Sequence, residues 1–356
     1  MPDIPTTSPG TRSSGRLISH LRYTVRDRIR NVGYRGGGPR FLVVRDSQHQ
    51  PSHNDHFLAY LARSRPAARK LFELHRLPCR VRDWSRYALF LPWVQDPLRE
   101  RFPAVYAQVR ALEQACTAKE VPVVSPADSL SRSIKSVALP IIRACGVRTA
   151  EAVPVGDVGE LRRVAASLGF PSLLREDRVH SGEMTLIRDD AELEAASPDG
   201  LDHPIAMEYI DVRSSDGFYR KYRYVMIGDV GFPRHLIVSR SWLVRARDRI
   251  RTPAVLEEEL AYLGAEDPNH EVLRRAQRAL GFDVVAFDYS YDRDGRLVVW
   301  EPNPFANLWQ GFNRDPYYGY QQPFLERIYD AMLTYYVERS RLDAAERACV
   351  LGSVVA

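Results

Sequence analysis

The sequence predicts a chain of mixed class, in which an N-terminal α/β domain with a parallel sheet precedes an α+β region. Three observations lead to this prediction. Short apolar segments alternate with helical patterns over residues 40–127, strand patterns separated by turns recur over residues 128–340, and two later strand patterns carry carboxylates. Alternating strands and helices indicate a parallel sheet, whereas strands joined by short turns indicate antiparallel pairs.

The chain has the composition of an ordinary globular protein, with 356 residues of which 45% are hydrophobic and 27% are charged. No apolar stretch reaches the roughly 18 residues that a membrane-spanning helix needs, and the N-terminus lacks an apolar signal core. The four cysteines form no CxxC pair, which indicates reduced thiols rather than a disulfide framework or a zinc site. We therefore expect a cytoplasmic protein without a membrane span.

Residues 1–39 combine arginine with serine, threonine, proline and glycine, and this composition predicts a basic, disordered lead-in. Within it, residues 17–32 have spaced apolar side chains and are expected to form a basic amphipathic helix that packs on the body of the protein. The alternative is a helix that binds a membrane surface or nucleic acid. Elsewhere the arginines are scattered among acidic residues, so we do not expect a nucleic-acid partner.

Residues 40–127 are predicted to form the parallel α/β domain. The patterns predict strands at residues 41–44, 79–84, 88–93 and 121–125, and helices at residues 55–64 and 104–120. His49, His53 and His56 follow the first strand. Because open parallel sheets bind ligands beyond the carboxyl ends of their strands, we expect a polar, substrate-facing loop there; a metal site is the alternative.

Residues 128–203 are predicted to form a smaller α+β subdomain. Helices are expected at residues 134–147 and 157–170, and strands at residues 171–177 and 179–187. Gly146 and Gly169 end the two helices, and Asp157 caps the second one. The two strands predict a hairpin with a polar tip, and the alternative is a flap whose backbone N–H groups cover phosphates.

Residues 204–340 are predicted to form a larger subdomain, and residues 341–356 follow it as a tail that frays. Strands are expected at residues 204–210, 218–230 and 234–249, helices at residues 271–282 and 321–342, and a hairpin at residues 282–303. The turn of this hairpin is the sequence "DRDG" at residues 292–295.

Asp288 and Glu301 stand in the two apolar runs of this hairpin, and Asn303 lies two residues beyond Glu301. Residues on one face of an antiparallel pair lie side by side, so the two carboxylates could meet. Buried unpaired carboxylates are costly, and one explanation is a divalent cation, because carboxylate and amide oxygens suit Mg²⁺, which also keeps waters and substrate phosphates. The other explanation is an exposed edge hairpin whose acids pair with arginines, and the fragment alone leaves both open.

The segment "RRAQRALGFDVVAFDYSYDRDGRLVVWEPNP" resembles the ATP-grasp superfamily, whose members carry a helix, an aspartate strand, a turn and a glutamate–x–asparagine strand. The resemblance implies that Asp288, Glu301 and Asn303 bind magnesium, with manganese as an alternative, and that the nucleotide is ATP. Weaker motifs in the same order extend the resemblance over about residues 40–340. The predicted fold is therefore an ATP-grasp fold with an N-terminal parallel α/β domain.

The weaker motifs imply further site residues. Those that would bind the nucleotide are Lys135, Arg175, Gly182, Glu208, Tyr209, Ile210 and Lys221. Those that would assist catalysis are Arg223, Arg240 and Arg245. The chain also departs from the family pattern: Arg175 replaces a phosphate-binding lysine, the flap has the single glycine Gly182, and residues 239–251 lack the asparagine and arginine pattern of amino-acid ligases.

ATP-grasp enzymes generally convert a carboxylate into an acyl phosphate, which an amine then attacks to give an amide. The resemblance thus implies an ADP-forming carbon–nitrogen ligase that acts on small-molecule or peptide carboxylates and amines, and a homodimer is compatible with it. One alternative is a degenerate ATP-grasp protein that binds nucleotide without ligation, which Arg175 and the glycine-poor flap motivate. Another is a basic protein that binds nucleic acid or a membrane surface through residues 1–39 and 240–251.

Overall fold

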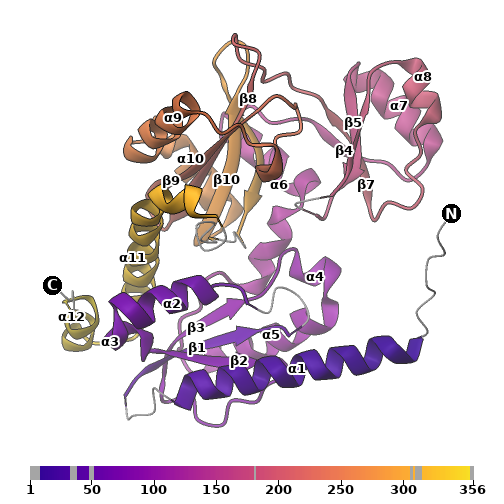
Figure 1. Ribbon diagram of the computed structural model, residues 1–356. Helices are drawn as coiled ribbons and strands as arrows, with labels where there is room; N and C mark the ends of the chain where they lie inside the picture. Colours follow the sequence, from indigo (N-terminus) through magenta and orange to yellow (C-terminus); the bar gives the residue numbers. More distant parts are fainter. Residues whose placement is uncertain are drawn as a thin grey trace. The chain divides into compact units, whose positions relative to one another are not determined.

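The chain divides into two units, which Figure 1 shows coloured along the sequence. The computed structural model describes residues 9–32, 38–47, 52–179, 182–304, 308 and 315–352. Unit 1 consists of Met1–Ala127, Asn307–Gln310 and Met332–Ala356, and unit 2 consists of Asp128–Ala306 and Gly311–Ala331. Within the described ranges, no helix combines the length and the apolar character that crossing a membrane requires.

Unit 1 is built on a parallel sheet of three strands in the order β2-β1-β3. Its strands are β1 (Arg40–Arg45), β2 (Phe72–Arg76) and β3 (Tyr87–Trp93). The predicted parallel pairing and the strands at residues 41–44 and 88–93 are confirmed. The strand predicted at residues 79–84 is wrong: β2 forms earlier, where buried and half-buried side chains alternate, whereas Val81 is the only aliphatic residue of that segment. The strand predicted at residues 121–125 is reduced to one bridge, between Val123 and Phe90.

The helices of unit 1 differ from the sequence prediction at both ends of the chain. They are α1 (Pro9–Val32), α2 (Asp55–Ser64), α3 (Pro66–Arg69), α4 (Leu98–Arg101), α5 (Pro103–Ala118) and α12 (Ala344–Gly352). Disorder was expected up to residue 16 and fraying after residue 341, but α1 begins at Pro9 and α12 forms in the tail. The prediction from composition was wrong because composition does not show which residues of unit 1 contact α1 and α12.

Helix α1 packs along β2, as one of the two sequence interpretations predicted (Figure 1). The side-chain amide of Asn31 donates to the carbonyl of Leu74 at 2.8 Å and accepts from its N–H at 3.0 Å. Two basic side chains of the helix, Arg26 and Arg30, form ion pairs with Asp55. These arginines are therefore engaged within unit 1.

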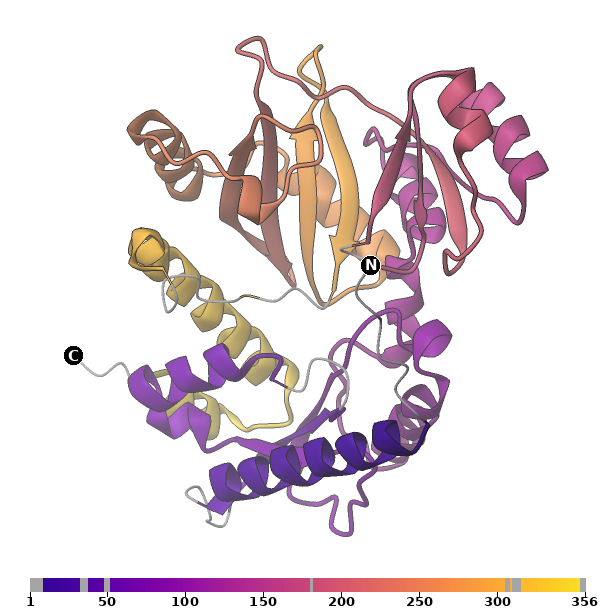
Figure 2. The ribbon, with the colours of Figure 1, turned by 45° about the vertical axis from the view of Figure 1, so that its right-hand side comes forward.

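The smaller sheet of unit 2 is antiparallel, with the strand order β4-β7-β5-β6. Its strands are β4 (Ala152–Pro154), β5 (Ser172–Glu176), β6 (Met184–Ile187) and β7 (Pro204–Glu208). Helices α7 (Val158–Leu168) and α8 (Asp190–Ala195) pack beside this sheet (Figure 2). Residues 204–210 were predicted in the larger subdomain, but β7 belongs to the smaller sheet because it pairs with all five residues of β5.

The larger sheet of unit 2 is also antiparallel, with the strand order β11-β10-β8-β9 (Figure 2). Its strands are β8 (Tyr219–Ile227), β9 (Val230–Ser239), β10 (Val284–Tyr291) and β11 (Leu297–Asn303). The other elements are α6 (Lys135–Ala144), α9 (Pro253–Gly264), α10 (His270–Leu280), α11 (Gln322–Arg339), and the short 3₁₀ helices η1 (Ala127–Ser133), η2 (Ala246–Asp248) and η4 (Pro316–Gln321).

One face of the larger sheet carries its apolar core. Phe287 and Tyr289 of β10 pack there with buried residues of α6 and α10, such as Ile142 and Leu273. Because successive side chains of a strand point to opposite faces, Asp288 lies on the other face of β10. The core therefore determines on which side of the sheet the predicted metal ligands gather.

Candidate functional site

Asp288 and Glu301 lie directly opposite each other in the β10–β11 pair, an arrangement that the sequence allowed but did not decide. The pairs next to the turn, from Tyr291↔Leu297 to Tyr289↔Val299, are in regular register. Continued regularly, this register would put Trp300 opposite Asp288. The register shifts between Asp288 and Tyr289, so that Trp300 is the extra residue of a β-bulge. The bulge brings Glu301 to the face of Asp288 while Val299 stays in the core.

Asp288 is bound by two cations of the neighbouring strand β8. The Nε and Nη2 atoms of Arg223 donate to its two carboxylate oxygens at 2.6 and 2.8 Å, and Nζ of Lys221 lies 3.5 Å from Oδ2. The carboxylate is 2% exposed. Burial acts to raise the pKa of Asp288, but the charges of Arg223 and Lys221 outweigh it and hold the pKa below its usual value. The structure thus brings together three residues that the resemblance assigned to the site.

Glu301 and Lys135 form the second charged pair of the site. Nζ of Lys135 lies 3.1 Å from Oε2 of Glu301 and donates to the carbonyl of Val179 at 2.6 Å. Nη2 of Arg175 donates to the same carbonyl at 3.0 Å. Burial lowers the pKa values of Lys135 and Arg175, and the charge of Glu301 opposes this effect in both. Lys135, Arg175 and Glu301, which are far apart in sequence, are therefore gathered around one buried site.

The position of Gly182, next to this cluster, leaves no room for a side chain. A Cβ atom at this position would lie 2.7 Å from Cγ2 of Val179, a separation that no side chain tolerates without movement of the valine. The two ends of the predicted flap therefore approach closely because residue 182 is glycine. His180 and Ser181, at the tip of the flap, lie outside the described residues.

The oxygen donors of the hairpin fit a hard cation such as Mg²⁺. Asn303 is buried, and its Nδ2 donates to the carbonyl of Ala286 at 3.5 Å, so its amide oxygen is the atom that a cation could use. Across the described ranges no cluster of three or more His, Cys, Asp or Glu is arranged to hold a metal ion. A cation at the hairpin would therefore have Asp288, Glu301 and Asn303 as its protein ligands and would complete its shell with water or phosphate, as Mg²⁺ usually does. The alternative metal site at the three histidines includes His49, which lies outside the described residues.

Three of the residues predicted to bind the nucleotide lie at the end of β7. The carboxylate of Glu208 pairs with Nη2 of Arg148 at 3.0 Å and accepts from the N–H of Glu151 at 3.2 Å. The ring of Tyr209 packs edge-on against Trp242, with 5.9 Å between the ring centroids. Ile210 is buried in the core of the smaller sheet. The carboxylate of Glu208 is thus already paired within the chain, and the role of these residues stays a prediction.

Arg240 and Arg245 are placed differently from the other predicted residues. Arg240 is exposed, and its guanidinium carbon lies 5.4 Å from the ring centroid of Phe218. Arg245 is half-buried and precedes helix η2. Their proposed catalytic role is therefore not supported by a contact with the carboxylate pair and stays a prediction.

Sequence reasoning missed a buried polar network centred on Glu259 of α9. Its carboxylate pairs with Nη1 of Arg249 at 3.0 Å and accepts from the hydroxyl of Tyr320 at 2.6 Å and from Nε2 of Gln321 at 3.0 Å. Gln321 in turn accepts from Nη1 of Arg234 at 3.1 Å. The signal in the sequence was weak, because Glu259 is one of three consecutive glutamates that read as an exposed helix face.

His235 lies between this network and the carboxylate pair. It stands opposite Arg223 in the β8–β9 register. Burial lowers the pKa of His235 well below its ordinary value, and the charges of Arg223, Arg234, Arg249 and Lys221 lower it further. A neutral histidine therefore stands among cations that belong to the carboxylate pair and to the network of Glu259.

We expect Glu259→Gln to destabilise the protein by roughly 3 kcal/mol, because it removes the partner of a buried arginine. The matched control is Glu257→Gln, which changes an exposed glutamate of the same helix. Chemical denaturation followed by circular dichroism measures both variants. Equal stability of the two variants would mean that the network does not contribute to folding.

Comparison with known proteins identifies the fold. No family model matches the sequence, and no curated protein matches it. The crystal structure of D-cycloserine synthetase DcsG is 17% identical, with a TM-score of 0.50, over 81% of this chain and 99% of that one. A RimK domain ATP-grasp protein from Sphaerobacter thermophilus is 14% identical, with a TM-score of 0.50, over 83% and 99% of the two chains.

A third structure is similar to the same extent. It is a RiPP-associated ATP-grasp ligase from Chryseobacterium gregarium, solved in complex with ADP and with a leader and core peptide. It is 10% identical, with a TM-score of 0.50, over 85% of this chain and 99% of that one. At these identities the similarity concerns the fold. The chain therefore has the fold of the ATP-grasp superfamily, which the resemblance of its C-terminal hairpin implied.

Proposed function

We propose that this protein is an ATP- and Mg²⁺-dependent ligase that joins a carboxylate to an amine and releases ADP and phosphate. The observation that carries the proposal is the bulged hairpin, which sets Asp288 opposite Glu301 and beside Lys135, Lys221 and Arg223. Such an arrangement suits a magnesium–triphosphate complex, because the paired carboxylates can bind the magnesium ion and the surrounding cations can bind the phosphates. The cytoplasm, expected from the sequence, supplies both ATP and Mg²⁺.

The reaction needs alignment and charge neutralisation more than covalent help from the protein. A carboxylate oxygen of the substrate attacks the γ-phosphorus of ATP, and the bond to the β-phosphate oxygen breaks to release ADP. An amine nitrogen then attacks the acyl carbon, phosphate leaves with the electron pair of the broken bond, and the amine loses a proton to give the amide. Magnesium bound at Asp288, Glu301 and Asn303 would offset the phosphate charge.

The chain's own cations take complementary roles in this proposal. Lys135 and Arg175, which share the carbonyl of Val179, would hold phosphate oxygens from the side of the smaller sheet. Lys221 and Arg223 would hold them from the larger sheet. Arg175 presents a fork of donors where a lysine would present one point charge, so it can bind two oxygens of one phosphate.

A second candidate is a nucleotide-binding protein without ligase activity, and one observation favours it. The two oxygens of Asp288 are both bound by Arg223, so that a metal ion would have to compete with a guanidinium for this ligand. If Arg223 keeps Asp288 in the presence of ATP, the nucleotide would be held by cations alone. The two candidates differ in whether Mg²⁺ is required for binding.

The first experiment is product analysis after incubation of the protein with ATP, Mg²⁺ and a pool of amino acids and short peptides. Peptides belong in the pool because one neighbour was solved with a leader and core peptide. We expect ADP and phosphate that increase with one component of the pool and disappear when EDTA replaces Mg²⁺. Formation of AMP would contradict the acyl-phosphate route. ATP binding without turnover and without need of Mg²⁺ would favour the second candidate, and no nucleotide binding would return the hairpin to a structural role.

A further inference from the structure

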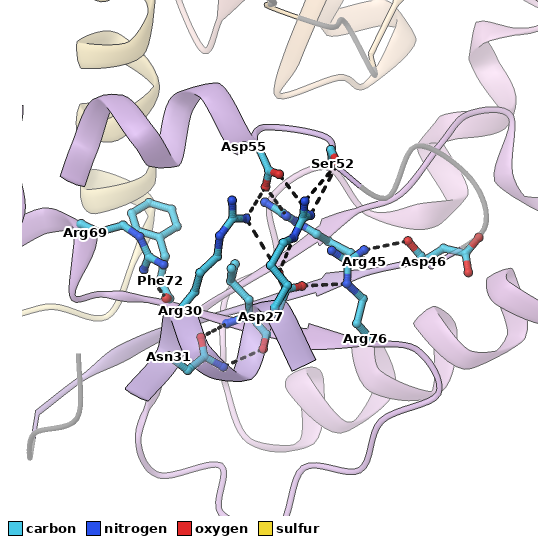
Figure 3. Close-up of polar contacts among 12 residues, drawn as sticks. Asp27, Arg30, Asn31, Arg45, Asp46, Ser52, Asp55, Arg69, Phe72 and Arg76 are labelled. Atoms are coloured by element: carbon cyan, nitrogen blue, oxygen red, sulfur yellow. Dashed lines mark hydrogen bonds and ion pairs between the residues drawn. The ribbon is translucent and has the colours of Figure 1, made fainter. Parts of the chain in front are cut away.

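Arg45 is a buried arginine of unit 1 whose donors are only partly used. It is the last residue of β1, it is 0% exposed, and Nη1 donates to Oδ1 of Asp55 at 2.7 Å (Figure 3). Its guanidinium carbon lies 5.1 Å from the ring centroid of Trp93, which covers the face of the group. Among the described residues, neither Nε nor Nη2 of Arg45 has a hydrogen-bond partner. Both donors lie in the plane of the guanidinium, so the aromatic ring does not satisfy them.

The two unused atoms form the edge of arginine that binds paired oxygens. Nε–H and Nη2–H point in nearly the same direction and match the two oxygens of a carboxylate or phosphate. The same chain also uses this edge in unit 2, where Nε and Nη2 of Arg223 bind Asp288 and those of Arg220 bind Glu258. Arg45 presents the same pair of donors, and within the described part of unit 1 no such carboxylate binds them.

The charges around Arg45 leave a positive excess. Its partner Asp55 is shared, because Nη1 of Arg30 lies 2.6 Å and Nη2 of Arg26 lies 3.1 Å from its oxygens. Asp27 is taken by Nε of Arg76 at 2.7 Å, and Nη1 of Arg76 donates to the backbone carbonyl of Asp46 (Figure 3). Four arginines, Arg26, Arg30, Arg45 and Arg76, thus share the two carboxylates of Asp27 and Asp55.

The position in the fold is one where ligands bind. Arg45, Arg76 and Trp93 are the last residues of the three parallel strands, and Arg45 pairs in register with both of the others. Open parallel sheets bind their ligands beyond this edge. Asp55 begins α2, and His53 precedes it, so the loop after β1 and the start of α2 also reach this edge.

Leaving these donors unsatisfied is costly. A buried donor without a partner loses its hydration and gains nothing in return. Burial lowers the pKa of Arg45 to about 10, although the charge of Asp55 opposes the shift. Burial also lowers the pKa of His53 well below its ordinary value, and the charge of Arg45 adds to this effect, so His53 is neutral and does not add to the positive charge near pH 7. An anion with two oxygens would satisfy both donors and balance the remaining charge.

We propose that the Nε–Nη2 edge of Arg45 binds a carboxylate or phosphate group of a small-molecule ligand at the carboxyl edge of the parallel sheet of unit 1. The site lies wholly within unit 1. It does not depend on the proposed magnesium and ATP site, so that either proposal can fail while the other holds.

The test is a titration of the full chain, labelled with ¹⁵N arginine, with inorganic phosphate and with acetate at constant ionic strength set by chloride. The Nε–H resonance of Arg45 is assigned by its absence from the Arg45→Lys variant. We expect it to shift in a saturable way with at least one of the two anions. The binding constant, measured by calorimetry for the same anion, should weaken at least tenfold in Arg45→Lys, which keeps the charge but removes the edge, and in Arg45→Met.

The matched control is Arg69→Met, which removes another buried arginine of unit 1, one that donates to the carbonyl of Phe72 at 2.9 Å. This variant should bind the anion as the wild type does. Saturation with phosphate alone would identify a phosphate ligand, and saturation with acetate alone would identify a carboxylate. An Arg45 resonance that does not respond to either anion, or equal binding by wild type and folded Arg45→Lys, would overturn the proposal. If Arg45→Met does not fold, the titration of the Arg45 resonance and the binding constant of Arg45→Lys still test the proposal.

Discussion

Replacement of Glu301 by glutamine is expected to abolish ATP turnover, a loss on the order of 10³-fold, while the fold remains intact. The substitution removes the negative charge that a magnesium ion would need and leaves an isosteric amide in its place. Lys135, the partner of Glu301, keeps its bond to the carbonyl of Val179 at 2.6 Å, so the variant does not leave a buried ammonium without an acceptor. Initial rates of ADP release measure the effect.

The control for this variant is Asp294→Asn, in the turn of the same hairpin. Asp294 is exposed and pairs only at the surface with Arg296, so its substitution should leave turnover unchanged. Circular dichroism should give the wild-type spectrum for both variants. Turnover close to the wild-type rate in Glu301→Gln would remove the magnesium assignment from the hairpin.

The second large effect is expected for Arg223→Met, which should destabilise the protein by roughly 3–5 kcal/mol because it breaks a buried ion pair at one partner. The carboxylate of Asp288 would keep only Lys221, whose Nζ lies 3.5 Å away. The double variant Arg223→Met/Asp288→Asn should recover much of the loss, since it removes the unpaired charge as well. Denaturant midpoints of the three proteins measure these differences.

The Arg223–Asp288 ion pair also predicts how the stability difference between wild type and Arg223→Met changes with pH. The pKa of Asp288 is lowered in the folded protein, so the stabilisation by Arg223 is present above the ordinary aspartate pKa of about 3.9 and is lost as the pH falls through the lower folded value. Wild type and Arg223→Met should therefore approach equal stability in acid. Arg247→Met, at an exposed arginine, serves as the control. If the difference in the free energy of unfolding between wild type and Arg223→Met stayed constant below pH 4, Asp288 would be excluded as its source.

Local patterns predicted the site's hairpin but not its register. The apolar runs around Asp288 and Glu301, and the turn between them, follow from alternation and turn chemistry that neighbouring residues determine. The extra residue at Trp300 does not, since a regular hairpin would have paired Trp300 with Asp288. The bulge forms where Tyr289 and Val299 remain in the core while the two carboxylates share the other face.

Long-range ion pairs were likewise beyond local analysis. Asp27 and Arg76 are 49 residues apart, and nothing near either of them in the sequence indicates that both are buried. For this reason the sequence predicted the helix at residues 17–32 and its packing, but not the ion pairs through which α1 contributes charged side chains to unit 1. The burial of Glu259 has no local signal for the same reason, because its partners Arg249, Tyr320 and Gln321 come from other segments.

The sequence by itself determined the parallel sheet of unit 1 and the hairpin that carries Asp288, Glu301 and Asn303, because apolar periodicity and turn residues act over a few positions. Only the tertiary structure decided which charges meet. It paired Arg223 with Asp288, placed Lys135 on Glu301 and, among the residues that the structure describes, left two donors of Arg45 without a partner. Such contacts depend on which distant segments are buried together, and burial makes each charge depend on its partner.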